Sequence, residues 1–314
     1  MRAVWSLWTK PLHASQHTGW PTQQHHLLSW ILSVFTARQH FEETHLVTDS
    51  AGADLLVETL DLPFDSVDLS LDALGQQDPD WWSLGKLYAY RAQHEPFVHI
   101  DSDVFLWNPL PPELLAADIF AQSPETAPYG RSYYRPESIE FDIRRHGGFL
   151  PPEFASHLPL GGEVRAANCG ILGGMRTDFI RHYADAAIQL VEHPDNAAAW
   201  ATRPRRDQDC VTVEQLTLTA CEAWHSGREA SPFRDVRLAY LFWSEAAAFS
   251  EAEARGYTHL VAGAKREPQA LAALEQIVAR AHPDRYSRVV DLCRKKAQSI
   301  ETRNTELSSV WSGF

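Results

Sequence analysis

Two aspartates stand one residue apart behind an apolar run, in the segment FVHIDSDVFLW at residues 97–107. Side chains at positions i and i+2 of an extended chain point to the same side, so Asp101 and Asp103 can converge on one point. Paired carboxylates with an open coordination sphere suit Mg²⁺ or Mn²⁺ bound together with a diphosphate. The alternative is a turn capped by Asp101 with a solvated Asp103, but the apolar VFLW that follows makes such a turn awkward. We therefore expect a divalent-metal site here.

The elements that must position these carboxylates alternate between strand and helix patterns. Such alternation predicts a mainly parallel sheet with helices on both faces, a Rossmann-like α/β fold. Ligands bind at the carboxyl ends of the strands in such sheets, where HIDSD lies. The expected strands are 3–8, 44–49, 65–71 and 96–101, and the expected helices are 22–39, 51–61 and 81–93.

The second half of the chain is less regular. Residues 124–162 are rich in Pro, Gly, Tyr and charge, which is typical of a functional loop, and we expect this insertion to shape an acceptor pocket. We expect one domain over residues 1–265 and a helical extension with a polar tail over 266–314. The other expected elements are a helix and a strand in 110–123, a strand in 166–175, helices 176–193 and 207–225, and a strand at 235–243.

Composition excludes several classes of function. The 314 residues carry a net charge of −13, so there is no basic face to attract a nucleic acid. The start, MRAVWSLWTKPLHASQ, contains no long apolar run, and we expect neither a signal peptide nor a membrane span. The cysteines show no paired spacing, which favours reduced thiols in a cytoplasmic protein over disulfides or a zinc site. They are Cys169, Cys210, Cys221 and Cys293.

The segment FVHIDSDVFLW resembles the DxD motif of glycosyltransferases with the GT-A fold. In these enzymes the two carboxylates hold a metal that clamps the diphosphate of a nucleotide sugar. One helix earlier, LGKLYAY resembles the place where they commonly carry a basic residue near the diphosphate, which implies that role for Lys86. The segment AANCGILGGM resembles the FNxGxxxx strand of families 8 and 32, which implies that Asn168 and Gly170 contact the donor sugar.

A fourth segment, THLVAGAKR, resembles the family 8 element HxxGxxK, which supplies a metal-binding histidine and a phosphate-binding lysine. His259 and Lys265 keep the spacing of that element, but the glycine falls one place late, at Gly263, and the following Pro-Trp is absent. The resemblance implies that this segment folds back over the donor site, with His259 on the metal and Lys265 on the diphosphate. The alternative is a plain surface turn.

Taken together, these resemblances imply a glycosyltransferase that uses Mn²⁺ or Mg²⁺. The metal ligands would be Asp101, Asp103 and His259. The expected donor is a nucleotide-diphosphate sugar, a UDP-sugar first of all, and the acceptor is a saccharide, a small molecule or a peptide.

Two sets of residues are alternatives for the acceptor side of the site. Family 8 enzymes carry DQD after their Asn-x-Gly strand, and this chain has DQD at 207–209 and EQL at 214–216. Either Asp207 with Asp209, or Glu214 with Gln215, is expected to face the sugar. We keep Asp209 and Glu214 as catalytic candidates, although an aspartate at a helix start is also an ordinary N-cap.

The nucleobase is expected over the first strands. Trp5 or Trp8 would stack on the base, and Asp49 would accept a hydrogen bond from the base or a ribose hydroxyl. The structural alternatives are a tryptophan in the core and a helix N-cap.

Two other functions remain open. HIDSDVF also resembles the first motif of haloacid dehalogenase-type phosphatases, in which Asp101 would be the nucleophile. Against this reading, three expected strands precede the motif, which normally opens such a domain. The other possibility is a non-catalytic protein that binds a sugar or nucleotide.

Overall fold

The fold is known from a computed structural model that describes residues 1–14, 19–128, 133–156 and 163–311, with side chains described up to residue 298. Its centre is a seven-stranded sheet in the order β3-β2-β1-β4-β7-β6-β8. All neighbouring strands are parallel except β7, which runs antiparallel to both β4 and β6. The mainly parallel Rossmann-like sheet is therefore confirmed. The strands are β1 (Arg2–Leu7), β2 (Thr44–Thr48), β3 (Ser66–Asp68), β4 (Phe97–Ile100), β6 (Ile119–Pro128), β7 (Glu163–Gly174) and β8 (Leu238–Tyr240).

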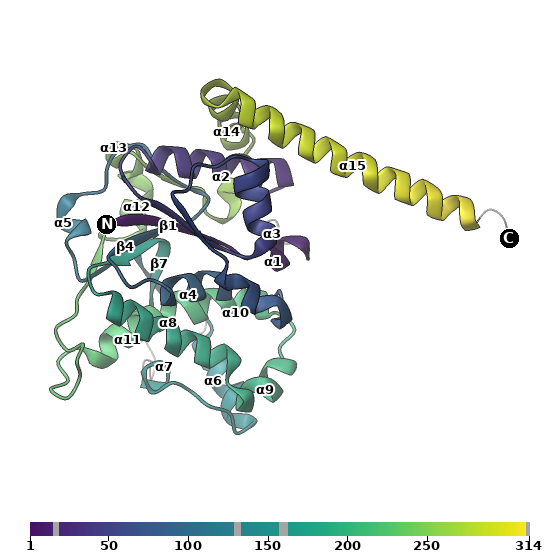
Figure 1. The fold of residues 1–314 in the computed structure, drawn as a ribbon. Helices are drawn as coiled ribbons and strands as arrows, with labels where there is room; N and C mark the ends of the chain where they lie inside the picture. The colour runs from purple at the N-terminus through teal and green to yellow at the C-terminus, as the bar shows by residue number, and fades with distance from the viewer. Residues whose placement is uncertain (15–18, 129–132, 157–162, 312–314) are drawn as a thin grey trace.

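Helices cover both faces of this sheet (Figure 1). One face carries α2 (Gln23–Ala37) and α14 (Pro268–Ala281), and the other carries α4 (Leu84–Arg91), α8 (Thr177–Glu192) and α11 (Thr217–His225). Each face has its own hydrophobic core. The strand β4 is buried at all four positions because helices cover both of its faces, and its residues are apolar except for His99. The shorter helices are α1 (Thr9–His13), α3 (Ser50–Ala53), α5 (Pro112–Leu115), α9 (Ala197–Ala201), α12 (Glu245–Ser250) and α13 (Ala252–Arg255).

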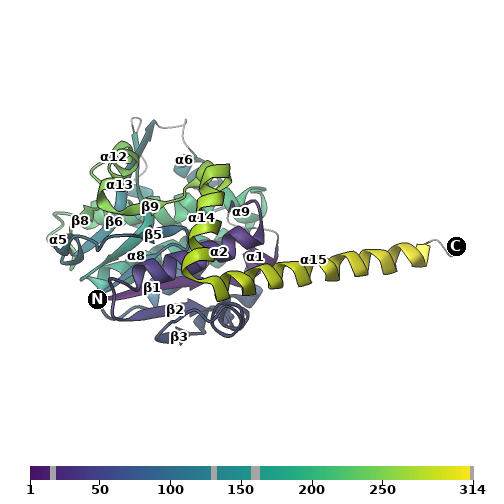
Figure 2. The ribbon, with the colours of Figure 1, turned by 90° about the horizontal axis from the view of Figure 1, so that it is seen from above.

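A second, two-stranded sheet joins distant parts of the chain. Its strands are β5 (Val104–Leu106), directly after the aspartate pair, and β9 (Tyr257–His259). They run antiparallel with Val104 opposite His259, and the Leu260 N–H donates to the Asp103 carbonyl at 3.1 Å. Seen from above, β5 and β9 lie side by side (Figure 2). The ladder therefore holds the THLVAGAKR segment against the aspartates.

The segment 124–162 is more regular than predicted. The strand β6 continues to Pro128, and two helices follow, α6 (Pro136–Arg145) and α7 (Pro152–Ser156). Proline in the first turn of α6 suits a helix start, and Arg144 and Arg145 complement its last turn. Residues 129–132 and 157–162 lie outside the described residues.

Several boundaries also differ from the predictions. The strands expected at 65–71 and 235–243 shrink to the three residues of β3 and the three of β8. The helix expected at 207–225 is α10 (Arg206–Val211), a π-helical turn (Thr212–Leu216) and α11 in succession. The wider turn changes the direction of its side chains, and it contains Glu214.

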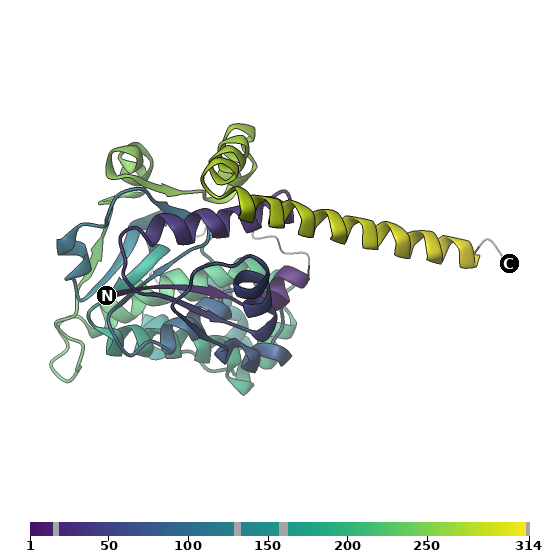
Figure 3. The ribbon, with the colours of Figure 1, turned by 45° about the horizontal axis from the view of Figure 1, so that its top comes forward.

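The C-terminal helices begin on the body of the protein. Leu274 and Val278 of α14 are buried in the same core as α2. The last helix, α15 (Pro283–Trp311), starts beside them, with Val289 buried, and then projects away from the domain (Figure 3). Among the described helices, none is both long and apolar enough to span a membrane.

Candidate functional site

The aspartate pair lies at the carboxyl end of β4, as predicted. The Asp101 N–H donates to the Gly170 carbonyl at 2.9 Å, and the Asp101 carbonyl accepts from the Ser33 hydroxyl at 3.1 Å. The backbone is thus fixed from the neighbouring strand β7 and from the covering helix α2. Asp103 follows two residues later and is 7% exposed, so its charge needs partners.

The partners of Asp103 come from the folded-back segment. Lys265 Nζ lies 2.5 Å from Asp103 Oδ2, and His259 Nε2 lies 3.5 Å from Asp103 Oδ1. Burial alone would raise the pKa of Asp103, but the charges of Lys265 and His259 outweigh it and hold this pKa well below its usual range. The structure thus brings His259 and Lys265 to the DxD motif, as the sequence motif predicted.

The orientation of His259 leaves one nitrogen for a cation. His259 Nδ1 lies 2.7 Å from Gln122 Oε1, which also accepts a hydrogen bond from the Tyr257 hydroxyl at 2.6 Å. An amide oxygen can only accept, so Nδ1 carries a proton, and Nε2 faces Asp103 and can bind a cation whenever it carries no proton itself. A hydrogen bond from the other ring nitrogen to a carbonyl is the usual support of a metal-ligating histidine.

The side chains around Asp103 are arranged so that they could bind a divalent metal ion. Asp101, Asp103 and His259 each offer a ligand atom, and these atoms all lie within 4.8 Å of one another. Within the described part of the chain, the buried Oδ1 of Asp103 has no hydrogen-bond partner. A buried carboxylate oxygen opposite an imidazole nitrogen needs either a proton or a metal cation between them, and this position can hold either. Oxygen ligands suit Mg²⁺ and Mn²⁺, and the added imidazole favours Mn²⁺.

Gly170 makes room for His259. A Cβ atom at this position would lie 2.5 Å from His259 Nδ1 and 2.5 Å from Gln122 Oε1. No real Cβ makes such contacts, so a side chain at residue 170 would push the imidazole away. The family resemblance implied that the backbone of Gly170 contacts the donor sugar. In the structure, the absence of a side chain at Gly170 is what allows His259 to occupy its position.

We therefore expect Gly170→Ala to weaken Mn²⁺ binding at least tenfold, about 1.4 kcal/mol, through displacement of His259. Mn²⁺ titration followed by electron paramagnetic resonance measures this directly. Gly75→Ala is the matched control, because nothing lies within 4 Å of a Cβ built at Gly75. Equal Mn²⁺ affinity of the two variants would show that His259 is not a metal ligand.

Lys86 is a partly buried ion-pair partner and not an exposed helix lysine. Its Nζ lies 3.0 and 3.1 Å from the two Asp101 oxygens and 2.7 Å from Glu214 Oε1. Glu214 also accepts from the Tyr90 hydroxyl at 3.0 Å. Burial lowers the pKa of Lys86, but Asp101 and Glu214 more than offset this and hold it above its usual range. Burial raises the pKa of the Asp101 carboxyl to about 6, opposed by Lys86.

Asn168 lies beside a glutamate that the sequence did not single out. Asn168 Nδ2 donates to Glu125 Oε1 at 2.7 Å, and Asn168 Oδ1 accepts from the Gly170 N–H at 3.0 Å. Glu125 is buried and also accepts from the hydroxyls of Tyr133 and Tyr134. Glu125 was hidden in the segment interpreted as irregular, where no strand pattern linked it to Asn168.

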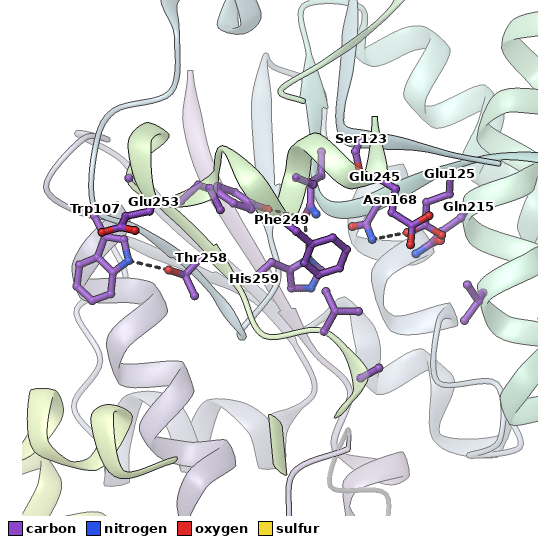
Figure 4. Close-up of a pocket in the computed structure, with 18 of the residues that line it drawn as sticks. Trp107, Ser123, Glu125, Asn168, Gln215, Glu245, Phe249, Glu253, Thr258 and His259 are labelled. Atoms are coloured by element: carbon purple, nitrogen blue, oxygen red, sulfur yellow. Dashed lines mark hydrogen bonds between the residues drawn. The ribbon is translucent and has the colours of Figure 1, made fainter. Parts of the chain in front are cut away.

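A cavity of about 1070 Å³ opens on this group. Figure 4 shows its two sides, with Asn168, Glu125 and Gln215 on one and Trp107 and Thr258 on the other, and with His259 and Phe249 between them. The DxD carboxylates are not among the lining residues, and His259 connects them to the cavity. A space of this size is large enough for a small-molecule ligand.

One known family covers most of this chain. It is a family of unknown function, DUF6734, and its match spans residues 1–292. The chain belongs to this family. No protein of curated function matches the chain.

In this DUF6734 protein, the four acceptor candidates do different things. Asp209 is buried in a bidentate ion pair with Arg203, with both contacts at 2.7 Å, and Asp207 pairs with Arg205 at 3.2 Å. Glu214 points toward Lys86, and Gln215 lines the cavity. The structure therefore separates the two halves of the EQL segment and gives Asp209 a structural role.

We expect Asp209→Asn to lower the free energy of unfolding by about 2 kcal/mol, because it weakens a buried, charge-assisted pair with Arg203. Ligand binding should stay within twofold of wild type, since Asp209 does not line the cavity. Urea unfolding and calorimetry measure the two quantities. Asp207→Asn is the control, with little expected effect on either, because its ion-pair partner Arg205 is exposed. If Asp209→Asn lost ligand binding strongly but kept the stability of wild type, Asp209 would again be a candidate catalytic residue.

The predicted nucleobase contacts do not fit this structure. Trp5 is fully buried, and its Nε1 donates to the Ser33 hydroxyl at 3.0 Å. Trp8 is 6% exposed and packs against Gly85. Asp49 caps α3 by accepting from the Gly52 N–H at 2.8 Å. A core tryptophan cannot stack on a base without refolding, so the structural alternatives hold for these three residues.

Proposed function

We propose that this DUF6734 protein is a metal-dependent glycosyltransferase that uses a nucleotide-diphosphate sugar, with a UDP-sugar as the first donor to test. The observation that carries the proposal is the position of Asp103. It stands at a strand end between His259 and Lys265, both supplied by a distant segment through the β5–β9 ladder. A histidine, a lysine and two aspartates converging beside a large cavity suit a metal–diphosphate complex.

Asp101, Asp103 and His259 are the residues that would hold Mn²⁺ or Mg²⁺. When bound, the metal supplies the positive charge that stabilises a departing nucleoside diphosphate. Lys86 is 2.7 Å from buried Glu214 and is thus a positioning residue, which holds the Asp101 carboxylate toward the site. This assignment replaces the direct diphosphate contact that the sequence suggested for Lys86.

Lys265 supplies a second positive charge that can change partner. Its ammonium neutralises Asp103 in the structure. A divalent cation on Asp103 would take over that role, and the ammonium would then be attracted to the diphosphate oxygens. Lys265 can thereby hold the acidic pair together without donor and hold the leaving group in its presence.

The cavity favours an acceptor that carries hydroxyl groups. Glu125, Asn168 and Gln215 offer carboxylate and amide groups along one wall. Phe249 is 72% exposed and Trp107 41% exposed, and both line the cavity. Exposed aromatic faces next to hydrogen-bonding groups suit the apolar face and the hydroxyls of a sugar ring, so a saccharide is the first acceptor class to test.

The proposed compartment is the cytoplasm. All four cysteines are free thiols in the structure, and three of them are buried. Buried, unpaired thiols are compatible with a reducing compartment.

We expect His259→Ala and Lys265→Ala each to weaken nucleoside diphosphate binding by roughly 1.5 to 3 kcal/mol, because each removes a charge-assisted contact. The effect of His259→Ala should require Mn²⁺, and that of Lys265→Ala should be larger with Mn²⁺ than without it, because the metal frees the ammonium from Asp103. Calorimetric titration with UDP, with and without Mn²⁺, measures both. The exposed neighbour substitution Arg266→Ala is the control. A loss below twofold in both variants would reject this part of the proposal.

The other two functions become outcomes of a single assay. A phosphatase with Asp101 as nucleophile would release inorganic phosphate from phosphomonoesters, whereas a non-catalytic protein would bind nucleotide sugars without turnover. The contact of Lys86 with both Asp101 oxygens favours a positioned metal ligand over a nucleophile, because an ion-paired carboxylate is a weaker nucleophile.

A further inference from the structure

A second group of metal-ligating side chains lies on the helical side of the protein, outside the DxD site. Glu153 comes from α7, His182 from α8 and His225 from the end of α11. The Nε2 atoms of His182 and His225 are 2.9 Å apart, and Glu153 Oε1 lies 3.0 Å from the first and 3.6 Å from the second. Three potential ligand atoms therefore face one another across a short triangle.

Hydrogen bonds between two neutral imidazoles and a carboxylate account poorly for the short contacts in this triangle. Each ring nitrogen carries either a proton or a lone pair. If His182 Nε2 donates to Glu153, it cannot also accept from His225. If it accepts from His225, its lone pair faces a carboxylate oxygen at 3.0 Å. Only one shared N–H could serve both contacts, whereas a cation at the centre would satisfy all three atoms at once.

The dimensions suit Zn²⁺. Zinc binds imidazole nitrogen at about 2.0–2.1 Å and carboxylate oxygen at about 2.0–2.2 Å, so tetrahedral ligand atoms lie about 3.3 Å apart. The three separations in the triangle spread around that value, from 2.9 to 3.6 Å. Two histidines and a glutamate form a known zinc ligand set that leaves a fourth position for water. The side chain of His182 is 33% exposed, which gives solvent access to that position.

The surroundings hold both imidazoles in place. His225 Nδ1 lies 2.8 Å from the Ser231 hydroxyl, so the second ring nitrogen is engaged and Nε2 stays directed at the triangle. The Phe233 ring packs against His182 and His225 at centroid distances of 5.1 and 5.2 Å. The ligands are therefore positioned by polar and apolar contacts that do not involve the DxD site.

We propose that Glu153, His182 and His225 bind one Zn²⁺ ion that fastens α7 to α8 and α11. The helix α7 has only five residues and is too short to be stable by itself. A zinc cross-link would anchor this end of the segment whose other end supplies Tyr133 to the cavity. The site is independent of the proposed transferase function, because it shares no residue with it.

The test is the zinc content and zinc affinity of the full chain. Protein stripped with a chelator is titrated with Zn²⁺ against a chromophoric chelator, for wild type, Glu153→Gln and His225→Ala. We expect both variants to bind one equivalent fewer than wild type, with affinity at this site reduced about 100-fold or more. Asp103→Asn should keep this equivalent, and so should His146→Ala, which changes an exposed histidine elsewhere.

A spectroscopic measurement keeps the test sharp if His225→Ala folds poorly. Co²⁺ in a tetrahedral nitrogen and oxygen site absorbs visible light strongly, and this absorption should appear in wild type and in Asp103→Asn but not in the near-isosteric Glu153→Gln. Added Zn²⁺ should raise the melting temperature of wild type and leave that of Glu153→Gln unchanged. Equal Zn²⁺ stoichiometry in wild type, Glu153→Gln and His225→Ala would overturn the proposal and leave a hydrogen-bonded triad only.

Discussion

Asparagine in place of Asp103 is expected to abolish the Mn²⁺-dependent part of nucleoside diphosphate binding. The substitution removes the charge of the carboxylate that His259 and Lys265 both contact, and it leaves Lys265 without that ion pair. A loss of about 3 kcal/mol, a hundredfold or more in Kd, follows from removing a charged contact in a buried site. Calorimetric titration of UDP at fixed Mn²⁺ measures it.

The matched control for that experiment is Asp235→Asn, which neutralises an aspartate whose side chain is 80% exposed. It should leave the Mn²⁺ effect intact, because exposed charges far from a site are screened. Circular dichroism of Asp103→Asn checks that the fold persists. A folded Asp103→Asn protein with the Mn²⁺ response of wild type would show that the DxD pair does not hold the metal.

The largest expected effect on stability is that of Lys86→Met. Methionine fills a similar volume, but it leaves the buried carboxylate of Glu214 and the partly buried carboxylate of Asp101 without their shared cation. Removing one partner of a buried ion pair costs about 3 to 5 kcal/mol. Denaturant unfolding at neutral pH should show this loss. The loss should shrink as the pH falls, because protonation removes the charges left unpaired.

A double-mutant cycle separates this coupling from lost packing. Adding Glu214→Gln to Lys86→Met should recover part of the stability, since it neutralises the more deeply buried carboxylate. Lys295→Met is the exposed control, with an expected change within about 0.5 kcal/mol. If Lys86→Met is as stable as this control, the ion pair is not buried as described.

The part of the site around β4 was readable from the sequence for a physical reason. A strand buried on both faces is mostly apolar, and β4 is apolar except for His99, so two carboxylates directly after it stand out in the sequence. The spacing of His259 and Lys265 was preserved as a motif, and it predicted their approach to Asp103 correctly. The β5–β9 pairing that joins them could not be read from two strands of three residues each.

Other residues could not be placed because their roles depend on pairings between distant elements. Glu125 meets Asn168 only through the antiparallel β6–β7 pair. Asp209 looked like a catalytic match, but Arg203, six residues earlier in the chain, donates hydrogen bonds to both of its oxygens. Trp5 was considered for base stacking because aromatic residues serve both in cores and in binding sites, and burial decides between the two. The second cluster comes from three separate helices and shows no motif spacing.

A donor turnover assay tests the proposed metal-dependent transferase activity directly. Purified protein is incubated with UDP-, GDP- and dTDP-sugars, with and without Mn²⁺, and released nucleoside diphosphate is measured beside inorganic phosphate from a phosphomonoester. We expect at least one donor to release nucleoside diphosphate in a reaction that requires Mn²⁺, is lost in Asp103→Asn and persists in Asp235→Asn. Phosphate release from the phosphomonoester, or no metal-dependent turnover of any donor by folded wild-type protein, would contradict it.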